Sequence, residues 1–111
     1  MKIKTADLIG LALDWAVAKC EWGNKFSNST DLVQVARRQG YSTNWGQGGP
    51  IIEREKIAVD WDHDCWNASK YGHPAYYSPA YYSAPTPLIA AMRCFVASRF
   101  GDEVDIPEEL L

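Results

Sequence analysis

The sequence predicts a single α+β domain, in which a small antiparallel sheet packs with two long buried helices. Two observations lead to this prediction. Residues 5–22 and 87–100 are almost entirely apolar over several turns, whereas residues 41–61 form short β-prone runs separated by glycine and proline. The chain has 111 residues, which is the usual size of one domain with one hydrophobic core. We therefore expect residues 1–111 to fold as one unit.

The first long helix is expected over residues 6–22, with the Thr5 hydroxyl as its N-cap. Asp7, Asp14 and Glu21 recur every seven positions and form one narrow polar stripe, while apolar side chains cover most of the remaining circumference. A helix with so little polar surface must be buried on more than one side.

The second long helix is expected from Pro87 to Phe100. The Thr86 hydroxyl can cap it, and proline suits its first position because the missing N–H costs nothing there. Gly101 suits a left-handed C-cap. Large apolar residues and three alanines along this segment indicate that it too is largely buried.

Shorter elements are expected between and after the two long helices. A small helix capped by Thr30 or Asp31 should end at Gly40. Residues 62–85 contain the string PAYYS twice and are rich in tyrosine and proline, so we expect an elaborated loop there. The expected strands are 42–45, 51–53, 57–61 and 104–106, with a turn at 46–50.

The composition excludes several classes of protein. With 47% hydrophobic and 23% charged residues, the chain is typical of a globular protein. No apolar run approaches the roughly 18 residues of a membrane-spanning helix, and the N-terminal stretch is unlike a secretory signal, so we expect a cytoplasmic protein without a membrane partner. A net charge of −3 gives no basic footprint for nucleic acid. Three cysteines without CxxC spacing indicate neither a disulfide framework nor a zinc ribbon.

Three segments of the chain resemble the NinX-like phage proteins, a family of small proteins of tailed phages and prophages described as having unknown function. They are KTADLIGLALDWAVAKCE, YSTNWGQGGPIIERE and PTPLIAAMRCFVASRFGDEVDIPEEL. The strings QGGPIIERE and PLIAAMR are the most specific parts. The resemblance implies a phage or prophage origin and action inside an infected bacterial cell. It implies no reaction.

A small-molecule site is expected around the stretch YSTNWGQGGPIIERE. Glycine permits close approach of a ligand, and aromatic faces with neutral hydrogen-bonding groups and arginine suit a purine ring with its ribose or phosphate. The alternative is that the rings fill a small core and the glycines only turn a hairpin. The candidate ligand-binding residues are Tyr41, Ser42, Thr43, Trp45, Gln47, Gly48, Gly49, Arg54, Trp61, Trp66 and Arg93.

Metal binding and catalysis find little support in the sequence. His63 lies between Asp62 and Asp64 with Cys65 next, but adjacent residues of an extended chain point to opposite sides, and no HxH or HxxxH spacing occurs. A solvated acidic turn is the expected structure. Glu53 and Glu55, on either side of an arginine, suit a solvated strand face, and no nucleophile has an evident base or oxyanion hole. We therefore expect no metal, no cofactor and no catalytic residue, and a nucleotide hydrolase ranks third among the functions considered.

The leading expectation is a non-enzymatic homo-oligomer that retains a nucleotide-like small molecule. In a phage setting, its expected purpose is to sequester a host immune signalling nucleotide. The alternative is a protein-interaction module that inhibits or modifies a host or phage enzyme through its tyrosine-rich loop, which could equally serve as a lid. Exposed rings in such number favour an oligomer that covers them. The tyrosines of this loop are Tyr71, Tyr76, Tyr77, Tyr81 and Tyr82. Ligand identity, strand order and subunit number stay open.

Overall fold

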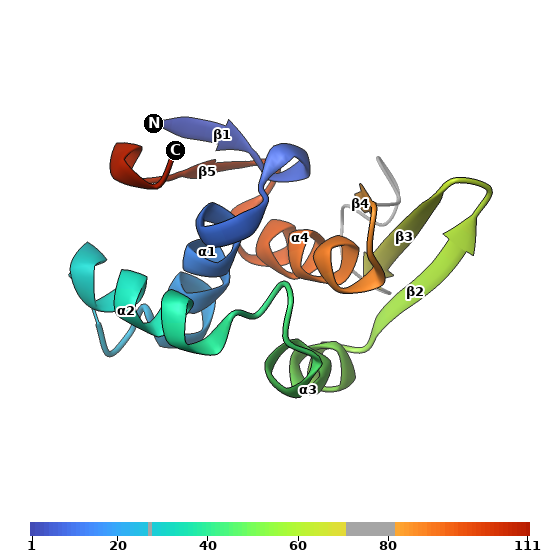
Figure 1. Cartoon of the computed structure of the whole chain (residues 1–111), viewed down its shortest axis with the longest axis horizontal. Helices are drawn as coiled ribbons and strands as arrows, with labels where there is room; N and C mark the ends of the chain where they lie inside the picture. Colours follow the sequence, from blue (N-terminus) through green and yellow to red (C-terminus); the bar gives the residue numbers. More distant parts are fainter. Residues whose placement is uncertain (27, 71–81) are drawn as a thin grey trace.

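The computed structural model describes residues 1–26, 28–70 and 82–111, which form helices and short strands (Figure 1). In chain order they are β1 (Lys2–Lys4), the 3-10 helix η1 (Thr5–Asp7), α1 (Gly10–Trp22), α2 (Ser29–Gln39), α3 (Trp45–Glu55), β2 (Ile57–Asp62), β3 (Cys65–Lys70), β4 (Tyr82–Ala84), α4 (Pro87–Phe100), β5 (Glu103–Asp105) and the 3-10 helix η3 (Glu108–Leu110). This architecture confirms the predicted α+β class.

Two small antiparallel sheets lie on different sides of α4 (Figure 1). In one sheet β1 pairs with β5, which places Ile3 opposite Val104. In the other sheet β2, β3 and β4 follow one another in chain order, and Trp66 of β3 lies between Trp61 of β2 and Ala84 of β4. The first pairing brings the N-terminal and C-terminal segments together.

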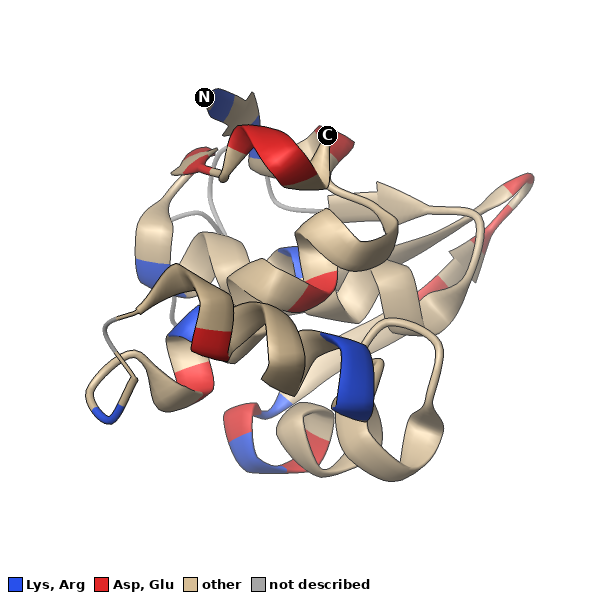
Figure 2. Ribbon diagram, turned by 60° about the vertical axis from the view of Figure 1, so that its left-hand side comes forward, with Lys and Arg blue, Asp and Glu red and all other residues tan. Residues whose placement is uncertain are grey.

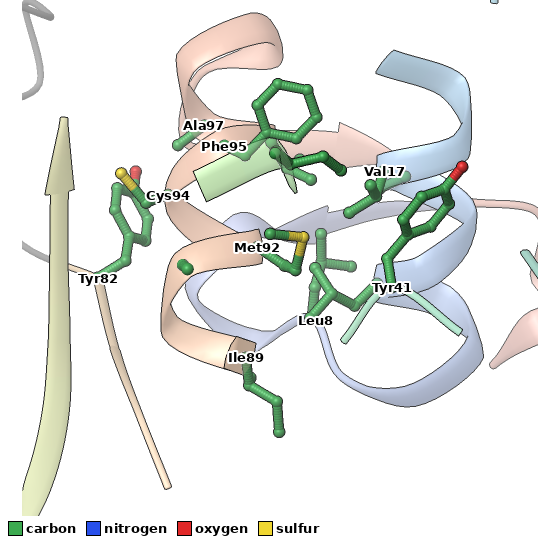
Figure 3. Packing of buried hydrophobic residues seen from close by; sticks show 14 of the residues in the cluster. Leu8, Val17, Tyr41, Tyr82, Ile89, Met92, Cys94, Phe95 and Ala97 are labelled. Atoms are coloured by element: carbon green, nitrogen blue, oxygen red, sulfur yellow. The ribbon is translucent and has the colours of Figure 1, made fainter. Parts of the chain in front are cut away.

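The central element is α4, which contacts all three strands of the larger sheet as well as α1 and α3. Because its sequence is apolar on every side, it can be enclosed in this way, and every residue from Leu88 to Ala97 is buried. Figure 3 shows Met92 of α4 and Val17 of α1 directed into the space between these two helices. The prediction that both long helices are buried is confirmed.

The start of the first helix differs from the prediction. Thr5 is not the N-cap of α1, because it is completely buried and bonds to the segment between α4 and β5 instead. Its backbone N–H donates to the Asp102 carbonyl and its hydroxyl donates to the Gly101 carbonyl, each at 2.8 Å. Pairing of β1 with β5 therefore takes the first residues out of the helix, which begins at Gly10.

The stretch YSTNWGQGGPIIERE is mostly helical, so the predicted strands at 42–45 and 51–53 and the turn at 46–50 were wrong. The Asn44 side chain accepts a hydrogen bond from the Gly46 N–H at 2.9 Å and caps α3. Gly48 and Ile51, three positions apart, are both buried, as one face of a helix requires. Glycine and proline suggested a turn, but the Asn44 cap and the buried face of Gly48 and Ile51 stabilise a helix.

The segment predicted as a loop at 62–85 contains two strands among its described residues, β3 and β4, so that prediction was wrong in part. Asn67 and Ser69 of β3 are buried although they are polar, and this hides the alternation that marks a strand. Tyr82 is buried as well, while the other four tyrosines of the predicted loop lie outside the described residues.

Several local predictions are confirmed. The Ile89 N–H donates to the Thr86 hydroxyl at 3.1 Å, so Thr86 caps α4, and Gly40 ends α2 in the left-handed conformation with φ of 58°. The predicted strands at 57–61 and 104–106 appear as β2 and β5. The cap of α2, however, is Asn28 rather than Thr30 or Asp31, and Gly101 has a positive φ without a left-handed ψ.

Candidate functional site

The candidate site is a cavity of about 230 Å³ where the N-termini of α3 and α4 meet. It is lined by Ser42, Thr43, Trp45, Thr86, Leu88 and Ile89. The two helices come this close because α3 has a glycine at the contact. A Cβ atom on Gly48 would lie 2.6 Å from Leu88 Cδ1 and 2.6 Å from the Tyr41 carbonyl oxygen, which is too close for any other residue.

Beside this cavity, each helix has one backbone N–H without an acceptor among the described residues. The first turn of a helix has N–H groups without intrahelical acceptors, and the caps satisfy those of Gly46 in α3 and Ile89 in α4. Within the described part of the chain, the N–H groups of Trp45 and Leu88 have no acceptor. Because both residues line the cavity, two positive helix ends with donors lie beside it.

Trp45 and Ser42 give the cavity its aromatic and polar groups. Trp45 is 55% exposed, so one part of its indole ring is available to a ligand. Ser42 is only 2% exposed, and its hydroxyl lies beside the Asp14 carboxyl, on whose pKa it acts.

Directly behind the cavity lies a buried carboxyl group. Asp14 of α1 is 7% exposed and accepts a hydrogen bond from the Ser42 N–H at 2.7 Å, so its predicted place on a polar stripe was wrong. Burial raises the pKa of Asp14 above its usual range. The backbone N–H and the nearby hydroxyl of Ser42 act in the opposite direction but do not outweigh burial.

The Asp14→Asn variant should gain stability relative to the parent as the pH rises from acid to neutral. Since the pKa is higher in the folded than in the unfolded state, ionisation opposes folding. That penalty is absent below the unfolded-state pKa of about 4 and grows as pH rises through the folded-state pKa. Asparagine keeps an acceptor for the Ser42 N–H. Urea unfolding from acid to neutral pH measures the difference in free energy of unfolding between variant and parent. Asp64→Asn at the exposed hairpin turn is the control. A difference that does not change with pH would contradict the prediction.

The remaining candidates from the 41–54 stretch occupy different surroundings. Tyr41 is buried, and its hydroxyl accepts a hydrogen bond from Trp22 Nε1 at 3.1 Å. Gln47 is exposed. A Cβ atom on Gly49 would be 3.9 Å from the Trp45 ring, so this glycine lies beside the indole.

Arg54 lies at the far end of α3. It follows Trp45 by nine positions, which is about 13 Å along a helix, and it donates to Glu21 of α1 and Glu55. Glu55 also accepts from Lys70 at 2.7 Å and from an arginine of α4 at 3.1 Å. The predicted solvated strand face is therefore a set of ion pairs that connects α1, α3, β3 and α4.

Arg93 is buried inside the fold and does not line the cavity. Its Nε donates to the Leu8 carbonyl at 2.7 Å and its Nη1 donates to the Ser83 carbonyl at 2.7 Å. Burial lowers the pKa of its guanidinium, and the nearby Asp7 acts in the opposite direction. These contacts give Arg93 a structural role between η1 and β4.

Trp61 and Trp66 lie on the β2–β3 hairpin. Their rings pack edge to face with centroids 5.4 Å apart, and Trp61 is 55% exposed. Figure 2 shows acidic residues at the tip of this hairpin. A second hollow of about 470 Å³ beside it is lined by Asp60, Trp61, Asp62, Asn67 and Ser83.

The structure thus groups Ser42, Thr43 and Trp45 at one cavity, with Gly48 forming the contact beneath it, and separates them from the two arginines and the hairpin tryptophans. Sequence reasoning missed Thr86, Leu88 and Ile89 as lining residues. The signal that could have found them is Thr86, whose capping pattern marks where α4 begins.

No set of three or more His, Cys, Asp or Glu residues within 1–26, 28–70 and 82–111 is placed to hold a metal ion. The helices in these same ranges are also too short or too polar to cross a membrane.

Comparison with known proteins gives one family. Residues 4–99 match the family model described as bacteriophage P22, NinX, which covers most of the chain. No curated protein gives a significant match to the sequence.

Proposed function

Because the chain belongs to the bacteriophage P22 NinX family, we propose that it acts for a phage in the cytoplasm of an infected bacterium, as a non-enzymatic binder of a nucleotide-like small molecule. The observation that carries the proposal is the cavity where α3 and α4 begin. There a half-exposed indole lies beside two helix N-termini whose first N–H groups have no acceptor in the described part of the chain.

Each part of a nucleotide has a matching group at this cavity. The Trp45 indole offers a flat face for a base, and base–aromatic stacking contributes about 1–3 kcal/mol per base. The N–H groups of Trp45 and Leu88 suit phosphate oxygens, as helix N-termini do in many proteins. The hydroxyl of Thr43, an exposed residue that also lines the cavity, suits the ribose.

The chemistry of the lining supports binding rather than turnover. The described lining residues supply hydroxyl groups and apolar surface, but none has a side chain that can act as a general base at neutral pH. A binder of this kind would act stoichiometrically, for example by sequestering a host immune signalling nucleotide. The exposed Trp45 and Trp61 favour a homo-oligomer that covers one of them.

Replacing Trp45 with alanine should weaken nucleotide binding about 10- to 100-fold, because the stacking face is lost. Isothermal titration against nucleoside monophosphates, cyclic nucleotides and ADP-ribose derivatives measures this. Trp61→Ala is the matched control, since both tryptophans are 55% exposed but only Trp45 lines the cavity. Equal losses in the two variants, or no heat from the parent with any member of the panel, would contradict the proposal.

A second candidate function is protein interaction through the β2–β3 hairpin together with the tyrosine-rich segment. The observation that favours it is the exposed Trp61 among acidic residues, since aromatic residues are enriched at interfaces. For this function Trp61→Ala is the test variant and Trp45→Ala is the control. In a pull-down from infected cells, Trp61→Ala would lose the partner and Trp45→Ala would retain it.

A further inference from the structure

We infer that the outer edge of β2 pairs with β2 of a second copy of this chain, antiparallel and with Val59 of each copy on the two-fold axis. The pairing specifies the interface of the homo-oligomer in the proposed function, on which it rests for that part alone, and it is independent of the ligand. Three features support it: an edge without a described partner strand, the order of charges along β2, and the exposed indole of Trp61.

The strand β2 has backbone groups available to another strand. Among the described strands, the larger sheet has the order β2-β3-β4, so β2 pairs on one side only. In Figure 1 the β2–β3 hairpin projects from the helices, with β2 on its outer side. The strand spans Ile57–Asp62 without a proline or a bulge, and every second residue directs its N–H and C=O groups away from β3. Such an edge is a template for another strand, and proteins usually shorten, distort or cover it.

Few registers are open to two copies of one strand. Because the outward backbone groups belong to alternate residues, an odd-numbered residue must lie opposite an odd-numbered one and an even-numbered residue opposite an even-numbered one. One residue then lies opposite its own copy, on the two-fold axis. Residues 57–61 of both copies pair if this residue is Val59, and residues 58–62 pair if it is Asp60. Every other register pairs a shorter segment.

The charges of β2 select the register with Val59 on the axis. With Asp60 on the axis, two aspartates would lie directly opposite each other, and like charges in this position are destabilising. With Val59 on the axis, Asp60 lies opposite Ala58 instead. Asp62 then lies opposite Lys56, the exposed residue that precedes the strand. One oppositely charged pair can therefore form at each end of the paired segment.

The same register covers apolar surface. Trp61 is 55% exposed, and it would lie opposite Ile57 of the second copy, on the face of the sheet that also carries Val59. Aromatic and β-branched side chains opposite one another stabilise antiparallel strands. Since Ile57 is already buried by its own chain, the gain in burial comes from the indole. One strand pair is a small interface, so the dimer should be weak.

Charge reversal tests the interface, with dimerisation measured by sedimentation velocity from about 1 µM to 1 mM protein. Lys56→Asp and Asp62→Lys should each weaken the dimer about five- to tenfold, because two attractive pairs in each dimer become repulsive. The double variant should regain most of the affinity. Aspartate tolerates the left-handed backbone of Lys56, whose φ is 56°. Glu109→Lys, at an exposed residue of η3, is the control with the same change in net charge as Asp62→Lys and should have no effect.

Single cysteines along β2 test the register. In a background that carries Cys65→Ser, Val59→Cys should form a reducible disulfide-linked dimer, because residues paired on the axis have Cα atoms about 4.5–5.5 Å apart. Ala58→Cys and Asp60→Cys are the controls. Each would meet its own copy only diagonally, at about 7–8 Å, which is beyond the reach of a disulfide.

The outcomes separate the interface from the proposed function. A disulfide in the Ala58→Cys or Asp60→Cys variant instead, or a dimer that neither charge reversal weakens, would overturn the inference and leave the homo-oligomer standing. A protein that stays monomeric at every concentration would overturn both, even if Trp61 retained a host protein in a pull-down. Titration with nucleotides measures the ligand-binding part of the proposed function independently.

Discussion

Replacing Gly48 with alanine should lower the free energy of unfolding by about 1–3 kcal/mol, although alanine is the better helix former. The added methyl group would lie 2.6 Å from the Leu88 side chain and 2.6 Å from the Tyr41 carbonyl oxygen. The carbonyl belongs to the backbone, so the helix as a whole must move away. Because this contact sets the distance between α3 and α4, the cavity beside Trp45 should change shape as well.

The neighbouring glycine provides the control. Gly49 also lies within α3, but a methyl group there would meet only the Trp45 ring at 3.9 Å, an ordinary contact distance. Gly49→Ala should therefore stabilise the protein by about 0.5–1 kcal/mol through helix propensity alone. Urea unfolding followed by circular dichroism measures both variants. If the two substitutions shifted stability in the same direction, the close approach of α3 to α4 would be refuted.

Replacing Arg93 with methionine should lower the free energy of unfolding by about 2–4 kcal/mol. Methionine matches the length of the side chain but cannot donate to the carbonyls of Leu8 and Ser83, both 2.7 Å from the guanidinium. Hydrogen bonds from a charged donor contribute about 1.5–3 kcal/mol each, and the loss leaves two acceptors without their donor. Relief from burying a charge offsets part of this effect.

Arg99 is the matched control because it lies on the same helix and is exposed. Its ion pair with Glu55 at 3.1 Å is one of several on that carboxylate, so Arg99→Met should cost less than about 1 kcal/mol. Thermal or urea unfolding distinguishes the two variants. A loss at Arg93 no greater than that at Arg99 would mean that the buried guanidinium does not hold η1 and β4 together.

The parts of the fold that follow from local chemistry could be predicted from the sequence. The second long helix has a capping threonine, a proline in its first position and an apolar circumference, and these three signals agree. The stretch beginning at Tyr41 gave conflicting signals. Its glycines and proline favour a turn, while the α-helix found there depends on Asn44 as a cap and on contact of Gly48 with α4, a tertiary effect that no local pattern contains.

The candidate site could be predicted only in part for a similar reason. Trp45, Thr43 and Ser42 are close in sequence and stay together at the cavity. Arg54 was expected with them. The helix places it about 13 Å from Trp45 along its axis, whereas the expected hairpin would have brought it back beside Trp45. Arg93 was expected to meet a ligand because its planar cation suits a phosphate or ribose. Its partners are instead backbone carbonyls at sequence positions that no spacing rule connects to it.

The β1–β5 pair has a mechanical consequence. Lys2 lies opposite Asp105, and the backbone groups of Met1 and Ile106 continue the pairing, so both chain ends leave the ladder at the same end. A force that separates the termini would then open the interstrand hydrogen bonds in succession, because they lie perpendicular to antiparallel strands. The β1–β5 pair would therefore open one hydrogen bond at a time, before the force disrupted the packed core around α4.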